Sequence, residues 1–260
     1  MNEVAWTAIS AVATALAFVA VAWQSILTRR ALAIAQTAAL DTARARLDNG
    51  APAVTVRLEA PIWPPLAGTA HGMPCNPWPR GHNFHFPNQE WEPTVLQAVA
   101  VVENLSGRRV EVRFDGDLIE DQDNRPVPAT TPVLVPAQNS ATGASGEHRV
   151  YLQRSFSAKQ LAENYEARKA GRELPHRVTG SITVHDDRDN GVEDTWSLTL
   201  TGCPLQPHEN LGSVWVTVPH HITEGTGLRS LQYDLLPPRR RTYWVSRRGG
   251  VELGEPRTAA

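Results

Sequence analysis

Residues 4–27 read VAWTAISAVATALAFVAVAWQSIL, and this stretch determines how the rest of the chain is organised. It contains no charged residue. An α-helix of this length rises about 36 Å, which exceeds the roughly 30 Å thickness of the hydrocarbon core of a bilayer. Trp6 and Trp23 lie near its two ends, where indole side chains prefer the boundary between lipid and water. The sequence therefore predicts a transmembrane anchor over residues 1–27, with both tryptophans at the membrane interface.

Two other interpretations of the apolar stretch are less well supported. A cleaved signal peptide needs a basic start and a cleavage site of small residues. The chain begins Met-Asn-Glu without Lys or Arg, and residues 20–22 resemble such a site only because alanine is frequent throughout. A helix buried in the core of a globular domain is rarely apolar on all sides over this length. A membrane anchor is the interpretation that both criteria favour.

The distribution of arginine predicts the orientation of this anchor. No Lys or Arg precedes the apolar stretch, whereas Arg29, Arg30, Arg44 and Arg46 follow it closely. Positive residues flank membrane spans on the cytoplasmic side. We therefore expect a single-pass protein of the cell membrane with its N-terminus outside and its C-terminal part in the cytoplasm. The alternative is an exported protein whose C-terminal part works in the envelope. Arg29 and Arg30 are expected among the anionic lipid headgroups.

Residues 28–50 predict a helical stalk that continues from the anchor. Residues 28–47 contain no Gly or Pro and are rich in good helix formers, and Asn49-Gly50 is a typical helix stop. Apolar residues recur every seven positions at Ile26, Ala33, Leu40 and Leu47. A coiled-coil seam needs a second apolar position in each heptad, and polar residues occupy that position here. A homodimer through the stalk is therefore the weaker alternative to a single amphipathic helix.

Composition fits one sizeable globular domain besides the anchor. The chain has 260 residues, of which 41% are hydrophobic and 20% charged, as in ordinary globular proteins. The formal net charge of −2 gives no general attraction to nucleic acid, so we expect no nucleic-acid partner. Cys75 and Cys203 are the only cysteines, too few for a disulfide scaffold.

From residue 51 the apolar residues recur with the period of two that is typical of β-strands. The clearest case is a hairpin over residues 178–201, whose turn ends in Asn190-Gly191. The other predicted strands are 53–58, 96–103, 110–114, 118–119, 133–135, 148–153 and 214–218. This number of short strands predicts an antiparallel β-sandwich over residues 51–220, immunoglobulin-like in architecture.

One short helix is predicted within the β-rich part. Ser157 and Gln160 have the spacing of a capping box, in which each side chain bonds the other residue's backbone N–H. Leu161, Ala162 and Tyr165 give one apolar stripe, and Gly171 is placed to end the helix. The fold class predicted is thus mainly β, with a transmembrane helix, a stalk and one inserted helix.

The most unusual stretch is residues 61–93, PIWPPLAGTAHGMPCNPWPRGHNFHFPNQEWEP. An insertion this long between two predicted strands is usually functional or disordered, and its many aromatic residues argue against disorder. We predict a surface that binds a protein partner, a hypothesis based on exposed aromatic area. Its candidate residues are Trp63, Trp78, Phe84, Phe86 and Trp91.

The same insertion contains the weak candidates for a metal site. Histidine and cysteine are the ligand types that zinc prefers. The four residues concerned are His71, Cys75, His82 and His85. Their spacing matches no zinc-module signature, so we predict no metal and no other cofactor. A metal-dependent enzyme built on these residues remains a minor alternative.

The C-terminal residues 221–260 are basic and are expected to be partly flexible, because they follow the last predicted strand of the sandwich. Arginine clusters here around Tyr243 and Trp244. The arginines are Arg239, Arg240, Arg241, Arg247 and Arg248. We expect these arginines to be solvated on a partly flexible tail. Of the two functional alternatives in an anchored protein, contact with anionic lipid is better supported than stacking on single-stranded nucleic acid.

No enzyme signature is present. The sequence lacks a G-x-S-x-G elbow, an H-E-x-x-H helix and a G-x-x-x-x-G-K-[ST] loop. It therefore predicts a non-catalytic protein that binds a partner, with no residue assigned as nucleophile or base.

Overall fold

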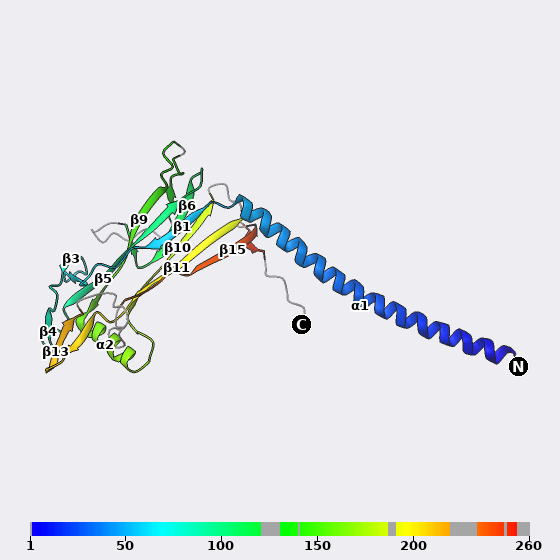
Figure 1. Cartoon of the computed structure of the whole chain (residues 1–260), viewed down its shortest axis with the longest axis horizontal. Helices are drawn as coiled ribbons and strands as arrows, with labels where there is room; N and C mark the ends of the chain where they lie inside the picture. Colours follow the sequence, from blue (N-terminus) through cyan, green and yellow to red (C-terminus); the bar gives the residue numbers. More distant parts are fainter. Residues whose placement is uncertain are drawn as a thin grey trace. The chain divides into compact units, whose positions relative to one another are not determined.

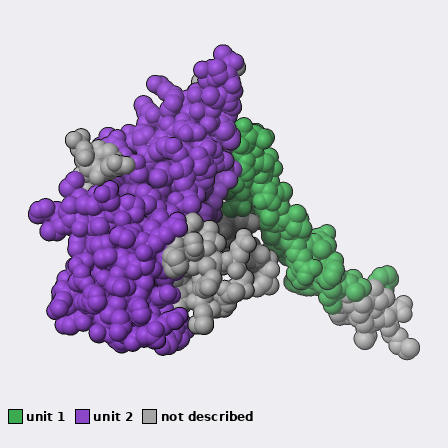
Figure 2. Space-filling model, turned by 60° about the vertical axis from the view of Figure 1, so that its left-hand side comes forward, with its two compact units in different colours: residues 1–50, 243–260 green, residues 51–242 purple. Residues whose placement is uncertain are grey.

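The computed structural model describes residues 2–120, 131–139, 141–186, 191–218, 233–246 and 249–253. The chain divides into two compact units (Figure 2). The first comprises Met1–Gly50 together with Tyr243–Ala260, and the second comprises Ala51–Thr242. The fold is mainly β, with antiparallel sheets and one long N-terminal apolar helix.

The first unit is dominated by a single helix, α1, over Asn2–Gly50 (Figure 1). Glycine and proline are absent until Gly50, so no residue before it interrupts the backbone hydrogen bonds. The apolar side chains that are described from Ala13 to Leu27 are exposed, and Leu16 and Phe18 are 65% and 73% exposed. The helix is long and apolar enough to cross a membrane, as the sequence predicts. Its division into an anchor and a stalk is an interpretation of this one helix.

Hydroxyl side chains in the described part of α1 bond to the helix backbone. The Ser25 hydroxyl donates to the carbonyl of Val21 (3.0 Å), and the Thr28 hydroxyl donates to that of Gln24 (2.8 Å). Such bonds to the preceding turn allow hydroxyl residues to enter an apolar environment without an unpaired donor. The four residues predicted for the membrane interface, Trp6, Trp23, Arg29 and Arg30, are all exposed on this helix.

The end of α1 contacts Tyr243, a residue of the same unit that lies in strand β15. Strand β15 spans Arg239–Ser246 and pairs with β16, Val251–Glu252. The Tyr243 hydroxyl lies 3.1 Å from both carboxylate oxygens of Asp48. The guanidinium of Arg44 lies over the Tyr243 ring, 5.6 Å from its centroid. These contacts hold the last turns of the helix against a strand.

In the described residues the strands form three antiparallel sheets. The first has the order β3-β2-β5-β9-β7, with β1 also paired to β5. The second has the order β16-β15-β11-β10-β6-β8, with β14 paired to β11, and the third has the order β12-β13-β4. The strands of the first sheet are β1 Val54–Leu58, β2 Leu66–Gly68, β3 Pro74–Pro77, β5 Pro93–Asn104, β7 Leu118–Ile119 and β9 Gly146–Ser157. The strands of the second sheet are β6 Val110–Gly116, β8 Val133–Val135, β10 Arg177–Asp186, β11 Val192–Thr201 and β14 Asp234–Leu236, together with β15 and β16. The strands of the third sheet are β4 Asn83–His85, β12 Leu205–His208 and β13 Leu211–Thr217.

The strands predicted from alternation are present. The predicted hairpin is the antiparallel pair β10 and β11, in which Ile182 pairs with Trp196. Residues 187–190 of its turn lie outside the described part of the chain. The apolar run 96–103 lies within β5, which pairs with β9 on one side and with β1 and β2 on the other. A strand that is buried on both faces has no need of polar alternation.

The two larger sheets share one core. Leu96 and Leu152 of the first sheet belong to the same buried cluster as Phe114 and Ile182 of the second. Gly180 of β10 lies at a close approach within this cluster. A Cβ atom there would come within 2.9 Å of Leu118 and 3.2 Å of Leu152, so only glycine fits without repacking.

Helix α2 spans Ala158–Lys169 and begins as the sequence predicts. The Gln160 backbone N–H donates to the Ser157 hydroxyl (3.2 Å), and the Ser157 backbone N–H donates to Gln160 Oε1 (2.9 Å). These are the two bonds of a capping box. Leu161 of α2 is fully buried in the main core, which fixes this helix on the second unit.

The predicted C-terminal arginine cluster divides in the structure. Arg239 and Arg241 pair with Asp194, whose carboxylate is nearly buried, at 2.5 Å and 2.6 Å. Arg240 is exposed, whereas Arg247 and Arg248 lie outside the described residues. Two of the five arginines are therefore engaged by the fold itself, which uses their charge to balance a buried carboxylate.

Candidate functional site

The insertion 61–93 is folded and contains three short strands. Strands β2 and β3 extend the first sheet beside β5, and β4 joins the third sheet by pairing with β13. In that pairing Phe84 lies opposite Trp215. The insertion therefore connects two sheets, and its side chains have fixed places in the second unit.

Four of the five candidate aromatic residues pack into this unit. Phe84 is fully buried, and its ring meets that of Trp78 edge-on at 5.1 Å. The Trp78 indole N–H donates to the Thr94 hydroxyl (3.2 Å), and the Trp63 indole N–H donates to the carbonyl of Val218 (2.6 Å). Phe86 packs against the core from a partly buried position. These residues stabilise the insertion by burying area and pairing their polar atoms.

Trp91 is different because 68% of it is exposed. The Lys159 ammonium lies over its ring, 5.1 Å from the centroid, and also lies 3.5 Å from Glu90. An exposed indole held by a neighbouring cation is the type of residue that anchors protein interfaces. Trp91 is thus the candidate aromatic residue best placed to meet a partner.

The four candidate metal ligands, all within the insertion, do not form one cluster. His71 and Cys75 are exposed on the insertion, and His85 is exposed on β4. His82 stacks on Trp78 with ring centroids 4.3 Å apart, and partial burial lowers its imidazole pKa. Within the described part of the chain no group of three or more His, Cys, Asp or Glu residues is placed to hold a metal ion.

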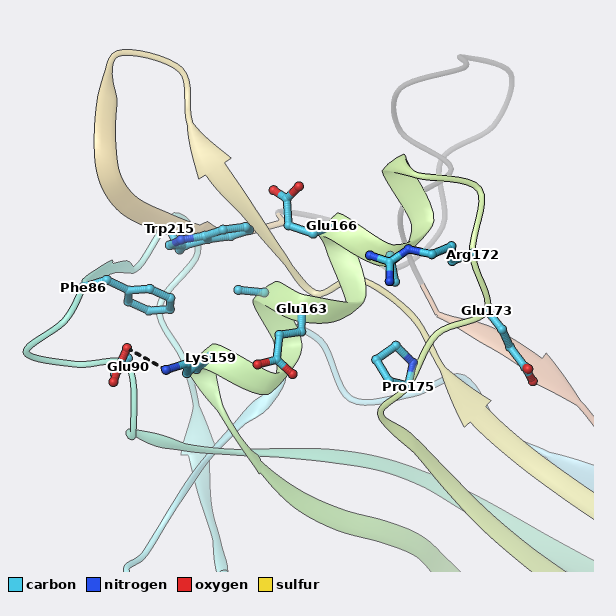
Figure 3. A pocket seen from close by; sticks show the side chains of 11 residues that line it. Phe86, Glu90, Lys159, Glu163, Glu166, Arg172, Glu173, Pro175 and Trp215 are labelled. Carbon is cyan, nitrogen blue, oxygen red and sulfur yellow. Dashed lines mark ion pairs between the residues drawn. The ribbon is translucent and has the colours of Figure 1, made fainter.

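A groove of about 510 Å³ lies beside α2 and extends from the insertion (Figure 3). Its aromatic end is formed by Phe86 and Trp215, whose rings stack at 5.9 Å with an interplanar angle of 28°. Tyr165 meets Trp215 edge-on at 5.6 Å and supports it from α2. The remaining lining residues are Glu90, Lys159, Ala162, Glu163, Glu166, Ala167, Arg172, Glu173 and Pro175. A groove of this size, with an aromatic end and charged side chains along the rest, is a candidate binding site.

The groove contains more acidic than basic side chains. Glu90 pairs with Lys159, as above, and Glu173 pairs with Arg177 at 2.6 Å. The Glu163 carboxylate lies 2.7 Å from the His176 imidazole. Glu166 is exposed and carries no ion pair within the described residues. Glu163 and Glu166 are three residues apart on α2, and their carboxylates point to opposite sides of the groove (Figure 3).

Sequence reasoning identified Phe86 of this groove but not Trp215, Glu163 or Glu166. Trp215 follows alternation within a strand, where an aromatic residue is ordinary. The glutamates lie on the polar face of a short helix, where charge is also ordinary. Only the pairing of β4 with β13 brings Phe86 and Trp215 together, and the sequence of neither stretch indicates this pairing.

No model of a known protein family matches this chain, and no curated protein matches it.

Proposed function

We propose that this chain is a single-pass membrane protein that presents its second unit to the cytoplasm and acts by binding a protein partner rather than by catalysis. In this proposal residues 1–27 anchor the chain, residues 28–50 form a stalk, and residues 51–220 form an immunoglobulin-like β-sandwich. The observation that carries the anchor is the outward-facing apolar surface of α1. Water is an unfavourable solvent for such a surface, and lipid is a favourable one.

The binding role is supported by the surface around the insertion. Trp91 is exposed on a well-packed support, and the groove formed by Phe86, Trp215 and α2 lies next to it through Glu90 and Lys159. Binding residues commonly lie on connecting segments that a rigid scaffold positions. We therefore assign the partner contact to Trp91 and this groove.

The two native cysteines allow the orientation to be tested without adding a new labelling site. Cys75 is exposed, whereas Cys203 is fully buried and its thiol pKa is raised by burial to about 12. The thiolate is the reactive form, so at neutral pH a membrane-impermeant maleimide should modify Cys75 alone. If the second unit is cytoplasmic, intact spheroplasts should show no labelling, and permeabilised ones should show one label per chain, counted by mass spectrometry.

Cys75→Ser is the control, and it should abolish labelling in permeabilised spheroplasts. Labelling of Cys75 in intact spheroplasts would overturn the cytoplasmic orientation and favour the envelope alternative. Recovery of the chain in the aqueous fraction rather than with the membranes would overturn the anchor instead.

The partner contact is tested by site-specific photo-crosslinking in the native membrane. A photoreactive phenylalanine analogue at Trp91 should give a discrete crosslinked species, because this side chain would lie in the interface. The same analogue at Glu147 is the control. Glu147 is exposed at the start of β9, whereas α2 follows the end of that strand. Equal crosslinking from both positions, or none from Trp91, would contradict the assignment. A point substitution is preferable to deleting the insertion, since deletion would remove Phe84 from the core.

A further inference from the structure

The geometry of the groove points to an arginine side chain of the partner polypeptide as its occupant. This inference rests on the proposed function, because it names the chemistry by which the binding unit would recognise its partner. Three features of the groove carry it: the stacked aromatic end, the Glu166 carboxylate on α2, and the neutralisation of the nearest cation.

The aromatic end offers a flat surface to a planar cation. Phe86 and Trp215 stack on each other, and Tyr165 meets Trp215 edge-on from α2. Two rings, from the insertion and from α2, therefore hold the Trp215 indole in place. Indole is the aromatic group that attracts cations most strongly, and a guanidinium can stack flat on it. An uncharged apolar side chain would bury area here but would make no bond to the Glu166 carboxylate.

A carboxylate completes the match. Glu166 extends from α2 on the side of Trp215, whereas Glu163 points the other way, toward Lys159 (Figure 3), and pairs with His176. A guanidinium carries five N–H donors in a fixed planar fork, so it can stack on a ring and bond a carboxylate at its edge at the same time. An ammonium group is a compact point charge without a plane. The combination of ring and carboxylate therefore favours arginine over lysine.

The basic residues of the groove do not oppose this occupant at the aromatic end. The Lys159 charge is balanced by Glu90 and covered by the Trp91 ring. Figure 3 shows Arg172 and Pro175 on the side of the groove away from Phe86 and Trp215. Trp91 lies beyond Lys159 and is largely exposed. A polypeptide occupant would reach this indole as well as the groove, whereas a free amino acid would not.

The test measures binding of short peptides to the full chain in lipid nanodiscs by fluorescence anisotropy. The probes are a labelled, end-blocked Gly-Gly-Arg-Gly-Gly peptide and the same peptide with citrulline or lysine in place of arginine. Citrulline keeps the shape of arginine but carries no charge. We expect saturable binding of the arginine peptide, at least tenfold weaker binding of the citrulline peptide, and intermediate binding of the lysine peptide.

Variants locate the site. Glu166→Gln removes a carboxylate without changing the size of an exposed side chain, and it should weaken the arginine peptide at least fivefold. Glu147→Gln is the matched control at the other end of β9 and should leave binding unchanged. Equal binding of the citrulline peptide, no loss with Glu166→Gln, or no saturable binding would overturn the inference. A single arginine with blocked ends serves as a further probe. If it binds as tightly as the peptide, the assignment of a polypeptide as the occupant would be overturned. Two results together would reject the arginine occupant and leave the proposed binding function standing. They are crosslinking at Trp91 that persists in Glu166→Gln, and no binding of the arginine peptide.

Discussion

Replacing Ala15 by arginine is expected to move most of the protein out of the membrane fraction. Ala15 lies at the middle of residues 4–27, where a bilayer is least tolerant of charge. An arginine at the centre of a spanning helix costs about 3 kcal/mol on insertion scales. That cost corresponds to a roughly hundredfold shift in the insertion equilibrium.

The effect is expected to be large because the span is only moderately apolar. Much of it is alanine, and its large aliphatic and phenylalanine residues are Val4, Ile9, Val12, Leu16, Phe18, Val19, Val21, Ile26 and Leu27. Each favours insertion by about 0.3–0.6 kcal/mol at the helix centre. Their sum is therefore of the order of the arginine penalty, so one central charge removes most of the driving force.

Two substitutions serve as controls for Ala15→Arg. Ala15→Leu should retain the protein in the membrane, because it adds apolar surface at the same position. Ala31→Arg should also retain it, since this residue lies beside Arg29 and Arg30 beyond the apolar stretch. The measurement is the share of the chain that sediments with membranes and resists carbonate extraction. An unchanged share for Ala15→Arg would count against a membrane span.

Much of the β-rich part was predictable because local signals agree with the final fold. The hairpin of β10 and β11 follows from strict alternation and an Asn-Gly turn. The capping box of Ser157 and Gln160 marks the start of α2 to the residue. The apolar run of β5 predicts a central strand, and its neighbours cover both edges. In each case the residues that decide the structure are close together in the sequence.

The candidate site could be predicted only in part, because distant segments build it. Alternation is broken by proline and glycine in residues 61–93, so β2, β3 and β4 gave no strand signal. Exposed aromatic area was the basis for the hypothesis about this insertion, yet Phe84 is a core residue. Aromatic composition does not reveal which ring is exposed, since burial depends on the strand that pairs with the segment. The strand that pairs with Phe84 contains Trp215, which lies about 130 residues later in the sequence.

The C-terminal arginines illustrate a second limit. A cluster of arginines near a chain end is usually solvated, and sequence offers no sign that Asp194 is nearly buried. In the structure Arg241 makes two bonds to Asp194, from Nε at 2.6 Å and from Nη2 at 2.7 Å. Arg239 adds a contact to the same carboxylate and lies over the Trp196 ring at 5.3 Å. Pairing of β15 with β11 creates this arrangement, and a local pattern cannot show it.

Asn164→Ala is expected to be among the most destabilising single substitutions in the second unit. Asn164 of α2 is fully buried. Its amide N–H₂ donates to the carbonyls of His176 (2.6 Å) and Gly202 (3.0 Å), and its Oδ1 accepts from the His176 backbone N–H (2.9 Å). One side chain therefore joins α2 to the segments that flank β10 and β11.

Alanine at this position would leave those three backbone groups without a partner inside the protein. An unpaired buried donor or acceptor costs about 1–3 kcal/mol, and water entering the vacated space would offset part of the sum. We therefore expect the free energy of unfolding to fall by about 3 kcal/mol. It is measured by tryptophan fluorescence in denaturant on the full chain in nanodiscs.

Lys169→Ala, a substitution at an exposed position of the same helix, is the control. Its free energy of unfolding should stay within about 0.5 kcal/mol of that of the unaltered chain. Because α2 supplies Glu163 and Glu166, local opening in Asn164→Ala should also weaken the arginine peptide under conditions where the unit is still folded. A stability equal to that of Lys169→Ala would mean that Asn164 does not hold the helix in place.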